Sequence, residues 1–246
     1  MGYQITHSES NESPLGGAPA GGNFTRIAVF YDGGYFSEVS NYYKFGHPRH
    51  SRLSLRGVQE FIRYLVAQRE RVPVDFCLIT EARYFRGRFS AATASARNRL
   101  LSDRVFDEVL INEGITPHYL LREERGERPR ETGIDVWLAL EAYDLAVQRR
   151  VDVIALITCD GDFVPLVRKL QSLGVRVILL AWEFAYEESL EDGTRRFRET
   201  RVDSALLRTA IYPVPMHQVI DEGLARRDPR VENLFLVKEE PIEIGP

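Results

Sequence analysis

The sequence predicts an α/β fold built on a mostly parallel sheet, and two observations carry this prediction. Residues 153–157 read VIALI, a short apolar run rich in branched side chains that is typical of a strand buried on both faces of a parallel sheet. From Phe163 the apolar spacing becomes helical until Gly174, and residues 175–180 form a second apolar run. A strand, a helix and a second strand in this order form the unit from which parallel sheets are built.

Further strands and helices are expected on both sides of this unit. Apolar runs predict strands over residues 26–31, 74–80, 116–121 and 211–212. Apolar stripes at helical spacing predict helices from residue 35 toward 46 and over 54–68, 105–111, 134–145 and 202–210. Residues 184–201 are charged and are expected to form a loop and a helix at the rim.

The chain is expected to contain one folded domain with two appendages. Residues 1–24 are rich in Gly, Ser, Asn and Pro, which is typical of a flexible leader. The folded domain is expected over residues 25–213, and residues 214–246 are expected to form a C-terminal tail. The apolar segment 234–237 of this tail is expected to dock on the domain or on a partner chain, such as a second copy of the protein.

Composition limits the classes of protein that need to be considered. The net charge is −4 and the pI is near 5.8, so any binding of nucleic acid must come from a local patch. Cys77 and Cys159 are the only cysteines, which argues against a disulfide framework and against a cysteine-based zinc site. No apolar run approaches the ~18 residues that a membrane span needs. We therefore expect a soluble protein of the reducing cytoplasm.

Two acids follow the first of the two buried strands. Asp160 and Asp162 lie just beyond residue 157, and ligands of open α/β sheets bind at the carboxyl ends of the strands. Carboxylates packed this closely repel each other unless a cation lies between them. Alternatively, Asp162 only caps the following helix, which would leave Asp160 unexplained. From these residues alone both interpretations remain open.

Two more acids occupy comparable places. Asp32 follows the strand at 26–31 and precedes two glycines, a pattern that by itself favours a simple turn. Asp135 opens the helix at 134–145, where the helix dipole alone tolerates a negative charge. Because parallel strands present all their carboxyl ends at one edge, the acids can share a single crevice. A crevice lined by carboxylates suits Mg²⁺, which prefers a few carboxylates together with waters and substrate phosphate.

A group of arginines is interleaved with aromatic residues after the strand at 74–80. Six arginines accumulate around Tyr84, Phe85 and Phe89: Arg83, Arg86, Arg88, Arg97, Arg99 and Arg104. Arginines interleaved with aromatic residues suit phosphate contacts and base stacking. A charged, solvated helix face explains the same residues equally well, so the sequence leaves the two interpretations open.

Three segments together resemble the NYN domain, a branch of the PIN-like nuclease superfamily. They read YDGGYF at 31–36, GIDVWLALEAYDLA at 133–146 and DVIALITCDGDFVPLVRKLQSLGVRVILL at 152–180. The resemblance implies a Rossmann-like three-layer αβα sandwich over residues 25–213. It also implies a cluster of aspartates that binds Mg²⁺ or Mn²⁺, and cleavage of RNA.

The family's site residues can be carried over by position. Asp32, Asp135, Asp160 and Asp162 match the metal-binding acids, and Thr158 keeps the hydroxyl of the family's Ser-Gly-Asp-x-Asp-Phe motif. The resemblance thus implies that the four acids hold the metal and that Thr158 orients a carboxylate or water.

The sequence departs from the family pattern at positions that contact substrate. Cys159 stands where the family commonly has Gly, and Tyr35 where the first motif often has Asn. Thr132 precedes the second motif where a basic residue is common, with Arg130 just upstream. Tyr35 and Arg130 are therefore expected to contact nucleic acid, together with the arginines at 83, 86 and 88.

The leading hypothesis is a metal-dependent nuclease that hydrolyses the phosphodiester bonds of RNA, with single strands favoured. The alternative is a catalytically weak or inactive NYN-fold module that binds RNA or a protein partner in a regulatory role. Phosphomonoester hydrolysis in a haloacid-dehalogenase-like fold ranks last, because that chemistry needs a second Asp two residues after Asp32, where Gly34 stands.

Overall fold

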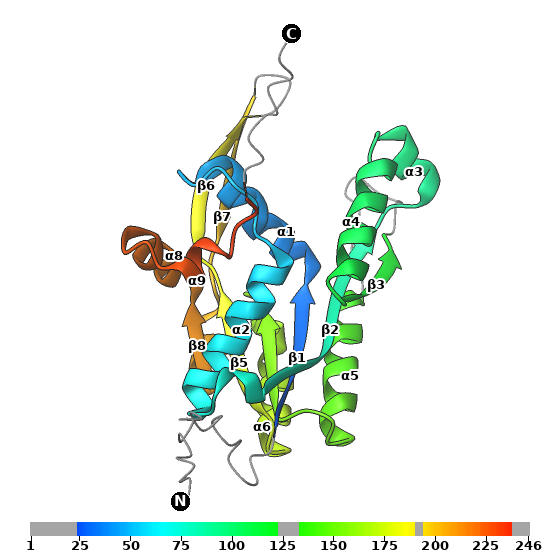
Figure 1. Cartoon of the computed structure of the whole chain (residues 1–246). Helices are drawn as coiled ribbons and strands as arrows, with labels where there is room; N and C mark the ends of the chain where they lie inside the picture. The colour runs from blue at the N-terminus through cyan, green and yellow to red at the C-terminus, as the bar shows by residue number, and fades with distance from the viewer. Residues whose placement is uncertain (1–23, 123–132, 190–193, 238–246) are drawn as a thin grey trace, which may run out of the picture.

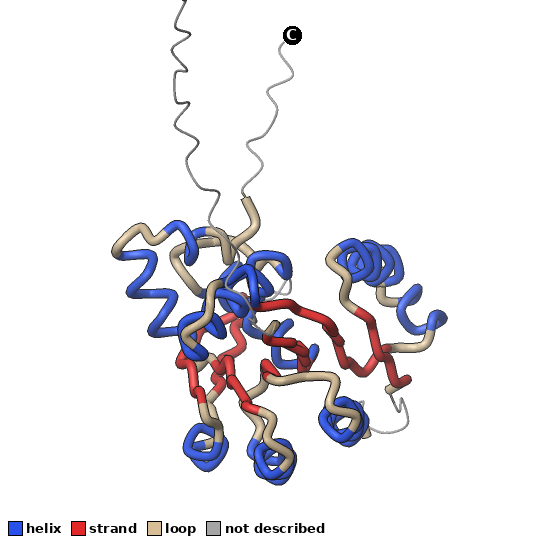
Figure 2. Tube along the Cα trace, turned by 60° about the horizontal axis from the view of Figure 1, so that its bottom comes forward, coloured by secondary structure: helices blue, strands red, loops and turns tan. Residues whose placement is uncertain are grey.

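The protein folds around a single parallel sheet, as its computed structural model shows for residues 24–122, 133–189 and 194–237. The sheet has six strands in the order β3-β2-β1-β4-β5-β8, and every pairing between them is parallel. The strands are β1 (Thr25–Asp32), β2 (Cys77–Arg88), β3 (Thr116–Leu121), β4 (Val153–Ile157), β5 (Arg176–Ala181) and β8 (Tyr212–Pro215). Helices cover both faces (Figures 1 and 2), which confirms the predicted three-layer αβα sandwich.

Two helical layers enclose the sheet. One layer contains α1 (Gly33–Asn41), a π-helical turn (Tyr42–Gly46), α2 (Leu55–Glu70), α4 (Leu100–Asn112), α8 (Met216–Ala225) and α9 (Pro229–Glu232). The other contains α5 (Ile134–Val147), α6 (Val164–Ser172) and α7 (Ser204–Thr209). Short elements complete the path: α3 (Ala91–Ala96) and two 3₁₀ turns at Val74–Phe76 and Gly161–Phe163. None of the helices in the described part of the chain is both long and apolar enough to cross a membrane.

Strand β1 lies at the centre of the sheet and is buried on both sides. Ile27, Val29 and Tyr31 contribute to the core beneath α1 and α2, whereas Ala28 and Phe30 contribute to the core beneath α5 and α6. Each of these side chains is 0% exposed. A strand of this kind reads as a continuous apolar run, which is why the sequence located it correctly.

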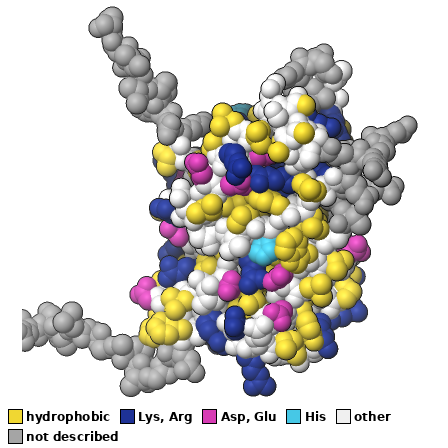
Figure 3. Space-filling model, turned by 90° about the vertical axis from the view of Figure 1, so that its right-hand side faces the viewer, with side chains coloured by type: hydrophobic (Ala, Val, Ile, Leu, Met, Phe, Trp, Pro, Cys, Tyr) yellow, Lys and Arg dark blue, Asp and Glu magenta, His cyan; other side chains and the backbone are white. Residues whose placement is uncertain are grey.

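Helix α5 is apolar on both of its faces. Its inner face is buried as predicted, but four residues on the opposite side are at least 36% exposed: Val136, Leu140, Tyr143 and Val147. Figure 3 shows apolar side chains gathered on the side of the molecule that carries α4, β3 and α5. Periodicity alone could not assign the outward-facing apolar residues to the surface, because helices that are apolar all round are usually buried.

Strand β2 is longer than its sequence suggests. The prediction ended this strand at residue 80, but the structure continues it to Arg88 and pairs Arg83–Arg88 with Thr116–Leu121 of β3. Tyr84 and Phe85 are buried on opposite sides of the sheet, so residues 81–88 follow the two-residue period of a strand. Glu81, Arg83, Arg86 and Arg88 interrupt the apolar run in this part of the sequence. The interpretation as a helix face is therefore wrong for Arg83, Arg86 and Arg88.

A two-stranded antiparallel sheet replaces the loop and helix expected over residues 184–201. It pairs β6 (Phe184–Ser189) with β7 (Arg195–Thr200) and projects past the carboxyl edge of the main sheet (Figure 1). Phe184 and Tyr186 are buried, whereas Ala185 between them is exposed, so the period is two. Phe184 stacks on Tyr42 with ring centroids 4.6 Å apart, which anchors the base of β6. Glu187 and Glu188 follow directly, so too few apolar residues alternate for the sequence to reveal the strand.

The folded unit extends well past residue 213, where the sequence placed the start of a tail. β8, α8 and α9 belong to the domain, and the chain then runs antiparallel to residues 52–54 through a bridge between Leu53 and Phe235. Leu234 is 0% exposed, so the apolar segment docks on its own domain. A Cβ on Gly57 of α2 would lie 1.9 Å from the carbonyl oxygen of Asn233, so this close crossing requires glycine. Residues 1–23 and 238–246, parts of the expected leader and tail, lie outside the described residues.

An ion pair joins the amino ends of β1 and β4. The Asp152 carboxylate accepts hydrogen bonds from the Arg26 guanidinium at 2.9 and 3.0 Å and from the Arg26 backbone N–H at 2.8 Å. The hydrogen bonds from Arg26 lower the pKa of Asp152 below its ordinary value. A carboxyl with a lowered pKa in the folded state stabilises the fold only while it is ionised.

We expect Asp152→Asn to lower the melting temperature at neutral pH and to have little effect in acid. The contribution of Asp152 is complete above the ordinary carboxyl pKa of about 3.9 and is lost as the pH falls through the lower folded-state value. Thermal unfolding from pH 7 to pH 2 measures the difference. Asp75→Asn is the matched control, since Asp75 is exposed and its side chain forms no hydrogen bond or ion pair within the described residues. A constant gap at every pH would contradict the assignment.

We expect Leu234→Ala to reduce the free energy of unfolding by about 2–5 kcal/mol, as deletion of a buried leucine does. Val237→Ala, at a side chain that is 91% exposed, should change it by less than about 0.5 kcal/mol. Urea titration of both variants distinguishes a segment packed into the domain from a detached tail, for which the two substitutions would have equal effects.

Candidate active site

The site is built where β1 and β4 end side by side. Tyr31 pairs with Ile157, so the next residues, Asp32 and Thr158, leave neighbouring strands at the same level. Thr158 is 0% exposed, and its hydroxyl donates to Oδ2 of Asp32 at 3.1 Å. The same hydroxyl oxygen accepts the backbone N–H of Asp160 at 3.3 Å. One buried hydroxyl therefore connects an acid on β1 to the turn that carries the acid pair.

The turn after β4 presents both of its acids to solvent. Oδ1 of Asp160 accepts the backbone N–H of Asp162 at 2.9 Å and caps the 3₁₀ turn at Gly161–Phe163. The capping residue is therefore Asp160, whereas the capping alternative had named Asp162. Both carboxylates are exposed at the carboxyl edge of the sheet.

Asp135 approaches this edge from α5. Gly133 has a φ of +89°, a left-handed conformation that suits glycine, and it precedes the first residue of the helix. Ile134 and Leu138 are buried against the sheet, whereas Asp135 in the first turn is exposed. The helix runs from the end of β3 to the start of β4, which places its amino end on the carboxyl side of the sheet.

The edge carries a negative potential. Burial raises the pKa of Cys159 to about 12, and the charges of Asp32 and Asp160 add to this shift. The thiol is therefore neutral at physiological pH. A divalent cation near these carboxylates would be attracted by the same field.

The carboxylates fit a hydrated cation better than a closed cage. Within the described ranges, no group of three or more His, Cys, Asp or Glu side chains is close enough to enclose a metal ion. Both Asp32 and Asp160 also use carboxylate oxygen to accept a backbone N–H. Mg²⁺ is usually held by one or two carboxylates and keeps several waters, which is the coordination that this arrangement permits.

Asp203 is a further acid at this edge, and the sequence interpretation missed it. It caps α7, and its own N–H donates to the carbonyl of Cys159 at 3.0 Å. A Cβ at Gly161 would lie 2.7 Å from Cγ of Asp203, so the glycine lets this acid pack against the turn of the acid pair. Its only sequence signal is an Asp directly before a short apolar helix, which also marks ordinary helix caps.

Two of the predicted arginines form ion pairs with acidic residues of the domain. Arg83 forms ion pairs with Glu81 and Glu141, and Arg88 binds Asp107 at 2.9 Å. Arg86 has no acidic partner within ion-pair distance among the residues that the structure describes. Arg130 and Thr132 lie outside those residues.

Tyr35 does not face solvent, which corrects the expectation that it contacts nucleic acid. It is 7% exposed, its hydroxyl donates to the carbonyl of Trp182 at 2.9 Å, and its oxygen accepts the N–H of Trp182 at 2.5 Å. Burial is the main reason that the pKa of Tyr35 is raised well above its ordinary value. Tyr35 therefore ties α1 to the end of β5.

We expect Tyr35→Phe to lower the free energy of unfolding by about 1–3 kcal/mol, because it leaves both backbone groups of Trp182 without their partner. Tyr143→Phe on the exposed side of α5 should change it by less than about 0.5 kcal/mol. Denaturant titration gives both values. A stable Tyr35→Phe protein with weakened binding of nucleic acid would instead support the original expectation.

Two known proteins are similar to this chain. An uncharacterized protein of Methanocaldococcus jannaschii is 30% identical over 95 residues, which are 39% of this chain and 35% of that protein. The chain thus spans about a third of the length of this curated relative. A crystal structure of a protein of unknown function from Vibrio parahaemolyticus aligns with a TM-score of 0.48 and 17% identity, over 79% of this chain and 94% of that one.

The family assignment rests on a longer match. The sequence profile of the NYN domain, which belongs to the PIN-like nuclease superfamily, matches residues 26–200 and includes all four predicted metal-binding acids. The chain is a member of the NYN domain family.

Proposed function

We propose that this protein is a metal-dependent ribonuclease that hydrolyses phosphodiester bonds of single-stranded RNA with Mg²⁺ or Mn²⁺. NYN domains are generally nucleases, and PIN-like nucleases typically use divalent metals. The observation that carries the proposal is the hydrogen-bonded chain from Asp32 through Thr158 to Asp160 and Asp162 at the carboxyl edge. Clustered exposed carboxylates repel one another, and a cation relieves that repulsion.

Each residue has a distinct role in this proposal. Asp32, Asp135, Asp160 and Asp162 would hold the ion or ions, one or two of them directly and the others through waters bound to the metal. A bound divalent cation supplies an activated nucleophile at neutral pH and stabilises the charge that develops on the phosphate. Thr158 fixes the orientation of the Asp32 carboxylate from a fully buried position, so it acts as a positioning residue.

The proposed substrate and cellular location follow from charge and cysteine usage. RNA would approach from the side of β2, where Arg86 lacks an acidic partner among the described residues, while Arg130 remains a predicted contact. Arg83 and Arg88 would shape this side of the site through their ion pairs. Both cysteines are free, which suits the reducing cytoplasm.

We expect Asp160→Asn to abolish RNA cleavage and to weaken Mn²⁺ binding at least tenfold, while the apo protein remains as stable as the wild type or becomes more stable. The stability follows because the substitution removes one charge from a repulsive cluster. Calorimetric titration with Mn²⁺, thermal unfolding in EDTA and cleavage of a labelled single-stranded RNA provide the three measurements.

Asp75→Asn is the matched control, because it removes the same charge from an exposed site at the amino end of β2. It should leave all three measurements unchanged. Full cleavage by Asp160→Asn would contradict the proposal. Mn²⁺ binding by the wild type without cleavage of RNA or DNA would favour the alternative, a NYN-fold binding module.

A further inference from the structure

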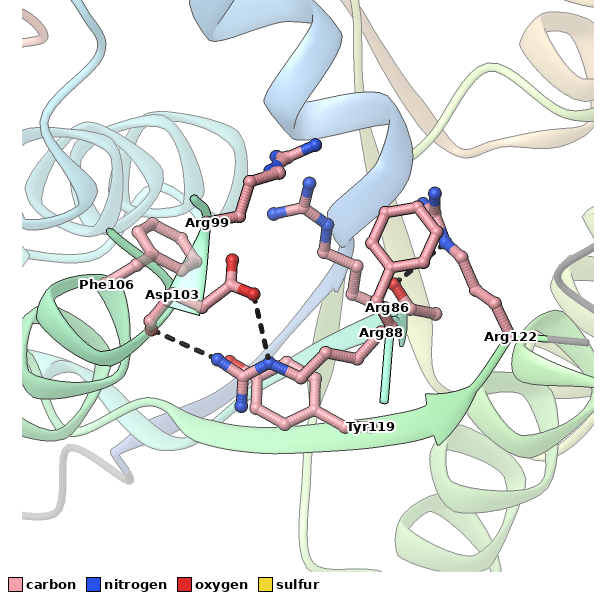
Figure 4. Close-up of a pocket in the computed structure, with 9 residues that line it drawn as sticks. Arg86, Arg88, Arg99, Asp103, Phe106, Tyr119 and Arg122 are labelled. Carbon is pink, nitrogen blue, oxygen red and sulfur yellow. Dashed lines mark hydrogen bonds and ion pairs between the residues drawn. The ribbon is translucent and has the colours of Figure 1, made fainter. Parts of the chain in front are cut away.

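A basic pocket lies between the carboxyl end of β2, the neighbouring β3 and α4. Arg86 and Arg88 of β2, Arg99 before α4 and Arg122 after β3 contribute to its wall. Asp103 is the only acid among the lining residues of the described chain. Figure 4 shows Arg86 and Arg99 extending their guanidinium groups to the same side of the pocket. We call this feature the arginine pocket.

The positive charge of the arginine pocket is not balanced within the described structure. Arg88 forms ion pairs with the nearby acids: its guanidinium nitrogens lie 3.9 Å from Oδ2 of Asp103 and 2.9 Å from Oδ1 of Asp107. Neither Arg86 nor Arg99 has an acidic side chain within ion-pair distance in the part of the chain that is described. Two guanidinium groups that extend to one place repel each other unless an anion lies between them.

A phenylalanine gathers more positive charge at the rim. The guanidinium carbon of Arg97 lies 4.3 Å from the ring centroid of Phe89, and that of Arg122 lies 5.0 Å from the same centroid. Because two guanidinium groups lie against the Phe89 ring, the ring holds these cations in place and offers little surface on which a base could stack. Phe89 is therefore a positioning residue, and the arginine pocket is suited to phosphate.

The arginine pocket lies next to the candidate active site. Asp32 at the end of β1 pairs with Phe85 of β2, so Arg86 follows one residue beyond the acid on the adjacent strand. Paired strands lie only about 4.8 Å apart. Arg86 also projects to the face of the sheet that α4 covers, because its neighbour Phe85 is buried on the other face. A phosphate held by Arg86 would thus belong to a nucleotide close to the bond being cleaved.

We propose that Arg86 and Arg99 bind a phosphate group of single-stranded RNA, adjacent to the carboxylates that hold the metal. The proposal rests on the proposed function for the identity of the ligand. Bidentate contacts of guanidinium with phosphate oxygens are charge-assisted hydrogen bonds, which are among the strongest in proteins. The phosphate is either the 5′-terminal group or one within the strand, since both present the same oxygens.

The test measures RNA binding without cleavage. A 3′-labelled oligouridylate of 12 nucleotides that carries a 5′-phosphate is titrated in EDTA. The titration compares the wild type, Arg86→Gln, Arg99→Gln and the double variant over a series of salt concentrations. Each single substitution is expected to weaken binding about tenfold. Each should also reduce the slope of log affinity against log salt by about 0.7, the value for one phosphate contact on a single strand.

Arg168→Gln is the matched control, because Arg168 is exposed on α6 in the opposite layer. It should retain wild-type affinity and slope. Thermal unfolding of every variant shows that loss of binding is not loss of fold. Folded Arg86→Gln and Arg99→Gln proteins that bind like Arg168→Gln would overturn the proposal.

Two further comparisons separate the sources of phosphate and the two proposals. The first comparison uses an oligouridylate with a 5′-hydroxyl. If its affinity no longer depends on Arg86 and Arg99, the bound phosphate is the terminal one; if its affinity still depends on them, the bound phosphate is internal. Both results support the arginine pocket.

The second comparison is between binding and cleavage. Metal-dependent cleavage by the wild type, with unchanged binding by both arginine variants, overturns the arginine pocket and leaves the nuclease proposal intact. Weak binding by those variants, with no cleavage by the wild type, supports the arginine pocket and contradicts the nuclease.

Discussion

The position of the candidate site depends on the parallel pairing of β1 with β4 and on the hydroxyl of Thr158 at the end of that pair. The paired residues 27–31 and 153–157 of the two strands are 0% exposed, so the carboxyl ends cannot shift without opening both layers of core. Thr158 transmits this rigidity to the loops, because it bonds to the side chain of Asp32 and to the backbone of Asp160. Flexible turns would otherwise carry these acids, and their spacing would vary with the motion of each loop.

Arginine has two different uses along β2, and strand geometry separates them. Arg83 shares a face with Phe85 and is neutralised by Glu141 of α5. Arg86 faces the other layer, where Arg88 pairs with Asp103 and Asp107 of α4, and Arg86 and Arg99 have no acidic side chain within ion-pair distance in the described structure. Ion pairs of the first kind position elements of the fold, while uncompensated charge of the second kind attracts an anion from solution. A protein with an overall net charge of −4 can therefore present a basic surface to nucleic acid locally.

Much of the fold could be predicted because buried parallel strands appear in the sequence as apolar runs, as in residues 153–157. The ends of these runs also located Asp32, Asp160 and Asp162, since an acid that follows a buried strand must lie at the sheet edge. The same rule failed for β2 and β6, because half-buried charged residues of β2 and the acids Glu187 and Glu188 of β6 interrupt the apolar pattern. Contacts between distant segments, such as Asp203 against Gly161, depend on how helices dock and leave no local pattern. The burial of Tyr35 beneath the end of β5 likewise depends on packing between distant segments and leaves no local pattern in the sequence.

The crossing of α2 by residues 233–236 has a consequence for synthesis of the protein. Leu53 bridges to Phe235, and the carbonyl of Leu234 accepts the N–H of Ser54, so the start of an early helix is completed by residues made about 180 positions later. While the chain emerges from the ribosome, the apolar side of α2 that these residues cover stays open to water and to chaperones. Contacts of such long sequence separation form slowly, because the chain must close a large loop before they stabilise it. A nascent chain that stalls before residue 234 would therefore expose a helix that the finished protein conceals.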